Sequence, residues 1–187
     1  MTTVSAQTAL RPRHLLRSAT AAHHDRVDRL FSQADLGCRE GYGRFLIAQA
    51  AAHLPIEAAL TEAGAATLLP DWHERRRASA LIQDLTALDL AMPNSCPAPA
   101  FDHPAAVLGG IYVLEGSRMG GRVLGRTVPS HLPSRFLDPG SSPTWTVVVA
   151  ALEKRLVDRE SLALAIAAAS NVFAVYESSA RYFLGVR

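Results

Sequence analysis

The sequence predicts an all-α protein with a single domain. Apolar residues recur every three or four positions along nearly the whole chain, a spacing typical of amphipathic helices. Runs of β-branched residues are scarce, and only residues 146–151 look strand-like. The chain has 187 residues, of which 49% are apolar, so one domain with a substantial core is expected. We therefore assign residues 1–187 to one helical bundle and expect residues 1–11 to be flexible.

Composition and charge argue against several classes of function. The formal net charge is only +2, and no basic run is interleaved with aromatic residues, so a nucleic-acid partner is not expected. Cys38 and Cys96 match no metal-ligand spacing and imply no disulfide framework. The first residues lack the apolar region of a signal peptide, and no stretch approaches the length and apolarity of a membrane span. A cytoplasmic protein without a membrane partner is expected.

The first predicted helix covers residues 12–31 and opens on Pro12, a favourable first-turn residue. His23 and His24 both fall on its apolar face, and periodicity cannot choose between them. A histidine in such a place is either a boundary or core residue or a metal ligand. The two overlapping stripes are Leu16, Thr20, His24, Val27 and Phe31, and Leu16, Ala19, His23, Val27 and Leu30.

Two further helices are predicted over residues 41–63 and 70–90. Pro55 should bend or interrupt the first of these, and His53, beside its buried face, is interpreted as structural. The charged run 74–77, Glu-Arg-Arg-Arg, is interpreted as a solvated face. The predicted core residues are Phe45, Ala48, Ala52, Ile56 and Leu60 in the first helix and Leu81, Ile82, Leu85 and Leu88 in the second.

A glycine-rich helix follows the proline-rich loop 91–104. Pro104 can open this helix, and residues 109–126 keep helical apolar spacing. Each glycine inside a helix costs about 0.5–1 kcal/mol relative to alanine. The glycines serve either close helix–helix packing or a flat ligand that lies directly on the backbone. They are Gly109, Gly110, Gly116, Gly120, Gly121 and Gly125.

The last third of the chain is predicted to be a loop followed by two helices. The loop covers residues 129–143, with its tip at 140–142. The helices cover residues 145–157 and 161–183, and Asp158 or Ser161 could cap the second. The predicted core face of that helix includes Leu164, Ala168, Val172, Phe173 and Tyr176.

The chemistry-bearing features are an apolar-face histidine and a glycine-rich helix. No Ser-His-Asp order, zinc-ligand cluster or phosphate-binding loop emerges, and the Gly120-Gly121 pair lacks the strand–turn–helix context of a nucleotide motif. One helix could offer an axial ligand to a flat metal-containing macrocycle, and the other could cover its opposite face closely.

At these residues the chain resembles the haem oxygenases, in particular the bacterial branch often found with biliverdin-binding photoreceptors. Residues 16–24, LRSATAAHH, resemble the N-terminal motif of that family, in which a histidine follows the threonine by four positions. That count selects His24 rather than His23 as the iron ligand. Asp28 matches an acidic residue near that histidine, and Arg17 is the retained basic residue of the motif.

Three later segments carry the rest of the resemblance. Residues 75–85, RRRASALIQDL, are similar to the third-helix pattern that ends in Asp-Leu. Residues 112–124, YVLEGSRMGGRVL, resemble the distal helix, and Phe173 matches an aromatic pocket residue. The resemblance implies haem contacts from His24, Arg17, Asp28, Tyr112 and Phe173, and a catalytic distal set of Gly116, Ser117, Gly120 and Gly121.

The resemblance implies a haem oxygenase, for which haem is both cofactor and substrate. Haem would be cleaved to biliverdin, CO and iron, using O2 and electrons from a reductase or ferredoxin, with a biliverdin-binding phytochrome as a downstream partner. Two departures stand out: Ser117 replaces an aspartate of the better-known branch, and Trp145 and Val149 occupy positions where that branch has basic residues. The alternatives are a non-catalytic haem-binding protein for storage or sensing, and the same fold without haem.

Overall fold

The computed structural model describes residues 11–137 and 144–185, and every regular element in those residues is helical. The all-α prediction is therefore confirmed. The N-terminal segment expected to be flexible, apart from Arg11, and the predicted loop tip at 140–142 lie outside the described residues. The elements are α1 (Pro12–Phe31), α2 (Arg39–Glu62), α3 (Ala65–Leu68), α4 (Trp72–Arg75), α5 (Ala78–Ala87), α6 (Pro104–Leu124), the 3-10 helix η1 (Gly125–Thr127), α7 (Trp145–Arg155) and α8 (Arg159–Leu184).

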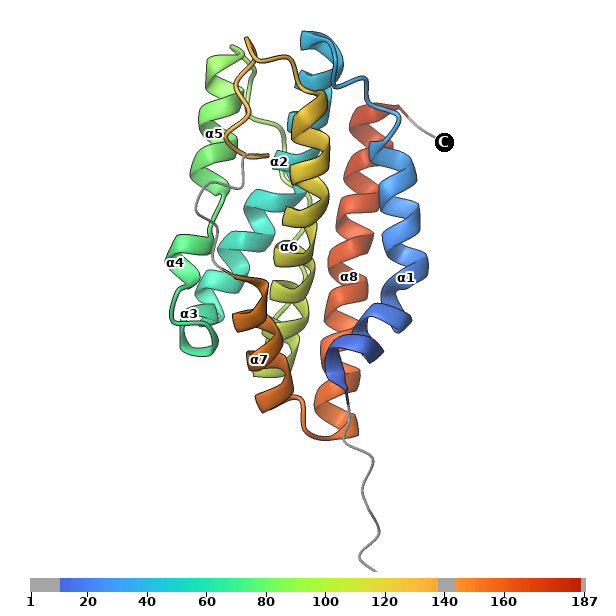
Figure 1. Ribbon diagram of the computed structural model, residues 1–187, viewed down its shortest axis with the longest axis vertical. Helices are drawn as coiled ribbons and strands as arrows, with labels where there is room; N and C mark the ends of the chain where they lie inside the picture. The colour runs from blue at the N-terminus through green and yellow to red at the C-terminus, as the bar shows by residue number, and fades with distance from the viewer. Residues whose placement is uncertain (1–10, 138–143, 186–187) are drawn as a thin grey trace, which may run out of the picture.

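The long helix α8 is the element on which the bundle is built. It packs along α6, α1 and α2, and α7 packs against α6 (Figure 1). Helices α1 and α8 run along one side of the molecule, while α3, α4 and α5 lie on the other side of α6. Helices α1 and α6 both rest on α8 but make few contacts with each other. This arrangement leaves a space between α1 and α6.

Local sequence signals explain where several helices begin. Pro12 and Pro104 stand in the first turns of α1 and α6, where a missing N–H costs little. Asp158 caps α8, because its carboxylate accepts the backbone N–H of Ser161 at 2.7 Å. Pro55 lies inside α2, which continues through it without interruption.

The predicted helix 70–90 is wrong as a single element. Residues 76–77 divide it into α4 and α5, and the short helix α3 was not predicted. The solvated face expected at 74–77 holds for Glu74 and Arg76, which are exposed, and is wrong for Arg75 and Arg77, which are 2% and 7% exposed. Arg75 is buried because two carboxylates compensate its charge: Asp71, with two hydrogen bonds at 2.8 and 2.6 Å, and Glu115, at 2.6 Å.

The predicted core residues are mostly buried. All five core residues named in α2 are at most 1% exposed, as is the predicted structural His53. The two exceptions are Ile82 in α5 and Leu164 in α8. They are 42% and 37% exposed, because each side chain points away from the neighbouring helices.

By length and composition, α8 is long and apolar enough to cross a membrane, alone among the helices of the described residues. The sequence-based expectation that no stretch approaches a membrane span is wrong in this sense. Its apolar composition reflects its packing, since α8 is in contact with three other long helices. A core helix of a soluble bundle has the same character.

Candidate functional site

A cavity of about 780 Å³ lies between α1 and α6, a volume typical of small-molecule sites. It extends to α8 and to residues 136–137, which follow η1. Every site residue predicted from the sequence lines this cavity, so the structure brings the whole predicted set together. These residues are Arg17, His24, Asp28, Tyr112, Gly116, Ser117, Gly120, Gly121 and Phe173.

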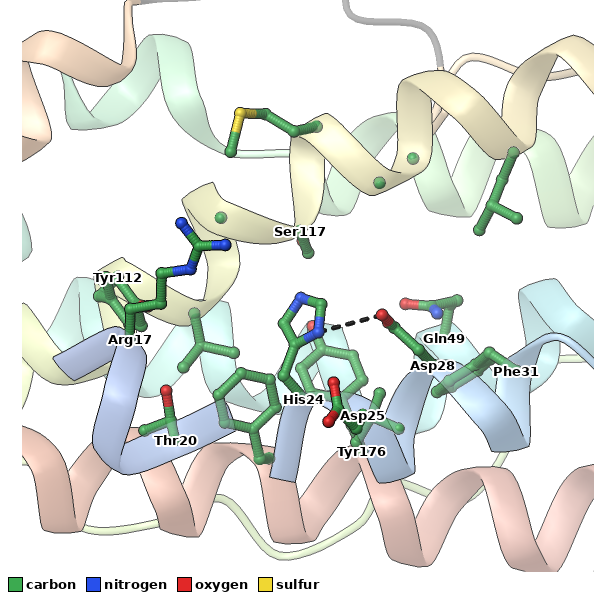
Figure 2. A pocket seen from close by; sticks show the side chains of 18 of the residues that line it. Arg17, Thr20, His24, Asp25, Asp28, Phe31, Gln49, Tyr112, Ser117 and Tyr176 are labelled. Carbon is green, nitrogen blue, oxygen red and sulfur yellow. Dashed lines mark ion pairs between the residues drawn. The ribbon is translucent and has the colours of Figure 1, made fainter. Parts of the chain in front are cut away.

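His24 provides an imidazole on the α1 wall. Its side chain points from α1 into the space between α1 and α6, and Ser117 projects towards that space from α6 (Figure 2). The Nδ1 atom of His24 lies 3.0 Å from a carboxylate oxygen of Asp28, one helical turn later. Since a carboxylate only accepts hydrogen bonds, Nδ1 is the donor of this bond, and Nε2 is the ring nitrogen left for another partner. This carboxylate contact is of the kind found behind metal-ligating histidines.

His23 belongs to a different environment. Its Nδ1 accepts a hydrogen bond from Arg26 at 2.7 Å, and Arg26 in turn donates to Glu177 of α8 at 3.1 Å. The His23 ring is stacked on Phe173, with ring centroids 6.4 Å apart, and does not line the cavity. Of the two histidines that periodicity could not separate, only His24 therefore reaches the site.

The α6 wall of the cavity is open at two of its glycines, where no side chain covers the backbone. A Cβ atom added at Gly116 or Gly120 would find nothing within 4 Å. Gly121 differs, because a Cβ atom there would lie 3.5 Å from Leu137, in ordinary contact. The backbone of α6 is therefore bare at Gly116 and Gly120, as a flat ligand would require.

The first two glycines of α6 serve packing instead. A Cβ atom at Gly109 would lie 2.2 Å from the carbonyl oxygen of Ala165 in α8. At Gly110 it would lie within 3 Å of Phe101 and Leu60. The packing alternative is thus realised at Gly109 and Gly110, while the open backbone at Gly116 and Gly120 leaves room for the flat ligand of the other alternative.

Arg77 is a site residue that the sequence analysis missed. Its guanidinium donates to Ser117 Oγ at 2.8 Å and to the carbonyl oxygen of Leu114 at 2.9 Å, and it lies 4.8 Å from the ring centre of Phe136. No carboxylate lies within ion-pair distance among the described residues. Burial, reinforced by repulsion from Arg118, lowers the pKa of Arg77 to about 10, so the group stays charged at neutral pH.

A buried polar chain was also missed. Tyr176 lines the cavity and bonds His53 Nδ1 at 2.8 Å, and His53 Nε2 lies 3.1 Å from Glu57. Burial lowers the pKa of His53 to about 4, so the ring is neutral at pH 7. Nε2–H therefore donates to Glu57, and Nδ1 accepts the Tyr176 hydroxyl proton. Glu57 also accepts the backbone N–H of Arg77 at 2.6 Å.

The end of the cavity near the start of α1 carries positive charge. Arg13 and Arg17 lie one turn apart on α1 and both line the cavity, as does Tyr112 of α6. Burial raises the pKa of Tyr112, opposed by Thr20 and the two arginines, so its hydroxyl stays protonated at neutral pH. Trp145 lies against Tyr112, with ring centroids 5.9 Å apart. A ligand with carboxylates at one end would suit this arrangement.

Together these features define a helical protein with a cavity that suits a flat, metal-containing and acidic ring. Within the described residues no three His, Cys, Asp or Glu side chains gather to hold a metal ion alone. His24 lines one wall of the cavity, the bare backbone at Gly116 and Gly120 belongs to the opposite wall, and Arg13 and Arg17 lie at one end. The residues present therefore fit haem.

Comparisons with known proteins give the family. No protein-family model matches the chain. A heme oxygenase of Xanthomonas campestris pv. campestris (strain 8004) is 36% identical over 114 residues, which cover 57% of this chain and 68% of that protein. The structure of the NO- and CO-bound heme oxygenase from Neisseria meningitidis has a TM-score of 0.81 and 25% identity, covering 96% of this chain and 94% of that one. The chain belongs to the haem oxygenase family.

Proposed function

We propose that this protein is a haem oxygenase that cleaves haem to biliverdin, CO and iron, using O2 and electrons from an external donor. Haem is then both cofactor and substrate. The observation that carries the proposal is the opposition, across one cavity, of His24 on α1 and the bare backbone of α6 at Gly116 and Gly120. Family membership supports the same activity.

His24 would bind the haem iron through Nε2. Asp28 accepts from Nδ1 of the His24 imidazole and so leaves Nε2 to face the iron, an arrangement common among ligating histidines. Phe173 of α8 packs beside the His24 imidazole, with the two ring centroids 5.9 Å apart. Arg17 would pair with a haem propionate, and we add Arg13 and Tyr112 because both line the same end of the cavity.

On the opposite face, Gly116 and Gly120 would let the haem ring lie close to α6, while Gly121 lies beside Leu137. When bound, haem supplies the iron that activates O2 and the ring carbon that is oxidised. The protein would supply orientation, since the backbone of α6 at Gly116 and Gly120 limits the space on this side of the cavity.

Ser117 and Arg77 would hold water on this face. The Ser117 hydroxyl donates to the carbonyl oxygen of Leu114 at 2.7 Å and accepts from Arg77, so its proton is committed. The remaining N–H groups of Arg77 are donors, and its charge favours negative charge developing nearby. Ser117 in place of aspartate thus comes with a fixed cation beneath it. Tyr176 and Gln49 add polar groups to the same cavity.

The proposal includes partners that the chain itself does not carry. No flavin-binding or iron–sulfur motif was found in the sequence, so electrons would come from a reductase or ferredoxin. We further propose a cytoplasmic location and a biliverdin-binding phytochrome as a downstream acceptor of the product.

The proposal is tested by haem titration followed by single turnover with a reductant and catalase, analysed by product chromatography. We expect one haem per chain and biliverdin as product. His24→Ala should abolish or transform the haem spectrum, and His23→Ala, the matched control on the neighbouring residue, should leave it nearly intact. Loss in His23→Ala alone would refute the ligand assignment. A red-brown complex that never turns green with a competent donor would favour the haem-storage or sensing alternative.

A further inference from the structure

Asp84 has no role in the site described so far. It belongs to the Asp-Leu pair that ends the pattern at residues 75–85, it is completely buried on α5, and it does not line the cavity. Its two carboxylate oxygens accept backbone N–H groups from a distant segment: Oδ1 from Arg135 at 3.1 Å and Oδ2 from Phe136 at 2.8 Å.

These bonds hold one wall of the cavity. We call residues 132–137 the strap. Phe136 and Leu137 of the strap both line the cavity. The Phe136 ring lies 4.8 Å from the Arg77 guanidinium carbon and 5.2 Å from the His53 ring centre. The side chain of Leu137 lies against Gly121 of α6 and Gly125 of η1.

The backbone bonds, and not the nearby arginine side chain, account for this hold. The guanidinium of Arg135 lies 3.9 Å from Asp84, and its side chain is 59% exposed, so solvent weakens that ion pair. The backbone N–H groups have no other acceptor among the hydrogen bonds of the described residues. A buried carboxylate is costly unless it is hydrogen-bonded. The Asp84 carboxylate and the strap's two backbone N–H groups therefore satisfy one another's hydrogen-bonding capacity.

We propose that Asp84 is a positioning residue of the cavity: by accepting the backbone N–H groups of Arg135 and Phe136, it fixes Phe136 and Leu137 as the wall that orients the bound ring. Its consequence for haem rests on the proposed function, whereas its hold on the strap does not. Asparagine at position 84 keeps one oxygen acceptor but turns an amide N–H₂ towards a backbone N–H. Alanine keeps no acceptor.

The first measurement is amide hydrogen exchange of the strap in the haem-free protein. We expect exchange in residues 132–137 to be about tenfold faster in Asp84→Asn, and faster still in Asp84→Ala, because lost hydrogen bonds lower the local opening free energy. Arg135→Ala is the matched control: it removes the guanidinium but keeps the N–H, and its strap should exchange as in wild type. If Asp84→Ala does not fold, Asp84→Asn carries the test.

The second measurement is haem titration and the isomer composition of the product. Asp84→Asn should weaken haem binding and convert a single biliverdin isomer into a mixture, and Arg135→Ala should do neither. A merely structural role would lower the melting temperature without changing the isomer ratio. Unchanged strap exchange in Asp84→Asn would overturn the proposal, as would faster exchange with wild-type affinity and isomer ratio. Failure of the wild type to bind haem would instead overturn the proposed function, with the exchange result intact.

Discussion

In the first half of α6 the glycines meet protein, and in the second half two of them meet open space. The backbone of α8 lies where a side chain of Gly109 would be, whereas Gly116 and Gly120 border only the cavity. The same residue type allows a neighbouring helix to approach in one half and a ligand in the other. A glycine in a helix therefore indicates close approach without indicating what approaches.

The two halves are also held by different forces. The first half is buried by apolar packing, with Leu108 and Ile111 at 0% exposure. The second half is held by charged and polar bonds to residues 71–77, chiefly Arg75 to Glu115 at 2.6 Å and Arg77 to Ser117 at 2.8 Å. The first half should therefore respond to changes in volume and the second to changes in charge and pH.

The largest effect on stability is expected from Gly109→Ala. Its Cβ atom would collide with the backbone of α8, which cannot move aside as a side chain can. We expect a loss of about 3 kcal/mol in the free energy of unfolding, measured by urea denaturation. Gly116→Ala is the matched control in the second half: it meets no atom and should gain about 0.5–1 kcal/mol from better helix propensity. Equal losses in both variants would remove the distinction between the halves.

The largest effect on ligand binding is expected from Gly120→Leu. The leucine would occupy the space over α6 that the ring needs, at an overpacking cost of about 2 kcal/mol, or roughly 30-fold in haem affinity. The unfolding free energy of the haem-free protein should not fall. The measurement is haem titration beside urea denaturation, and a loss of stability with normal affinity would contradict the open-wall interpretation.

Acid should destabilise the second half of α6, and the residues 75–78 bonded to it, before the first half. The pKa of His53 is lowered to about 4 by burial, so between pH 6.5 and 4 the unfolded chain binds a proton that the folded chain does not. Burial raises the pKa of Glu57, but its bonds to His53, Arg77 and Ala78 outweigh burial and hold it below the ordinary value. The free energy of unfolding should thus fall by about 2 kcal/mol from pH 7 to pH 5.

This pH effect is checked by amide hydrogen exchange at both pH values. Exchange should accelerate in residues 75–78 and 115–121 before it does in 105–113. His53→Gln should flatten the dependence, because glutamine does not titrate. A uniform acceleration along α6 would show that acid acts on the whole bundle.

The smallest effect is expected from Ser117→Ala. Arg77 keeps its bond to Leu114 but loses the hydroxyl acceptor, so the unfolding free energy should fall by only about 1 kcal/mol. Turnover should slow but continue, because the bare backbone at Gly116 and Gly120, and not the Ser117 hydroxyl, lets α6 lie close to the bound haem. Single-turnover rates decide this, and an inert Ser117→Ala beside an active Gly120→Leu would reverse the ranking.

Features of the fold with local causes could be predicted from the sequence. Periodicity and first-turn prolines placed α1 and α6 closely, and the apolar stripes identified most of the core. The predicted site residues line one cavity because the resemblance fixed their positions on three helices, α1, α6 and α8. Periodicity alone could not separate His23 from His24, since both lie at the edge of the same stripe.

The remaining features depend on contacts between segments far apart in the chain. Arg77 stands in a run of charges, which is usually solvated, and only its bond to Ser117, forty positions later, makes it part of the site. Asp84 looks like a helix-surface residue until the strap from 132–137 packs over it. No local pattern in either segment indicates its partner, so both roles required the structure.

The few contacts between α1 and α6 give the bound ring a second role. Each of these helices rests on α8, and the cavity between them has a volume of about 780 Å³. A ring seated there completes the interior of the bundle and stabilises it by binding only the folded state. The substrate would then be a temporary structural part of the protein, and cleavage, which opens the ring and frees the iron that His24 would hold, would leave the product less firmly held than haem. Each turnover would end with a looser molecule than it began with, which favours release of the product and entry of the next haem.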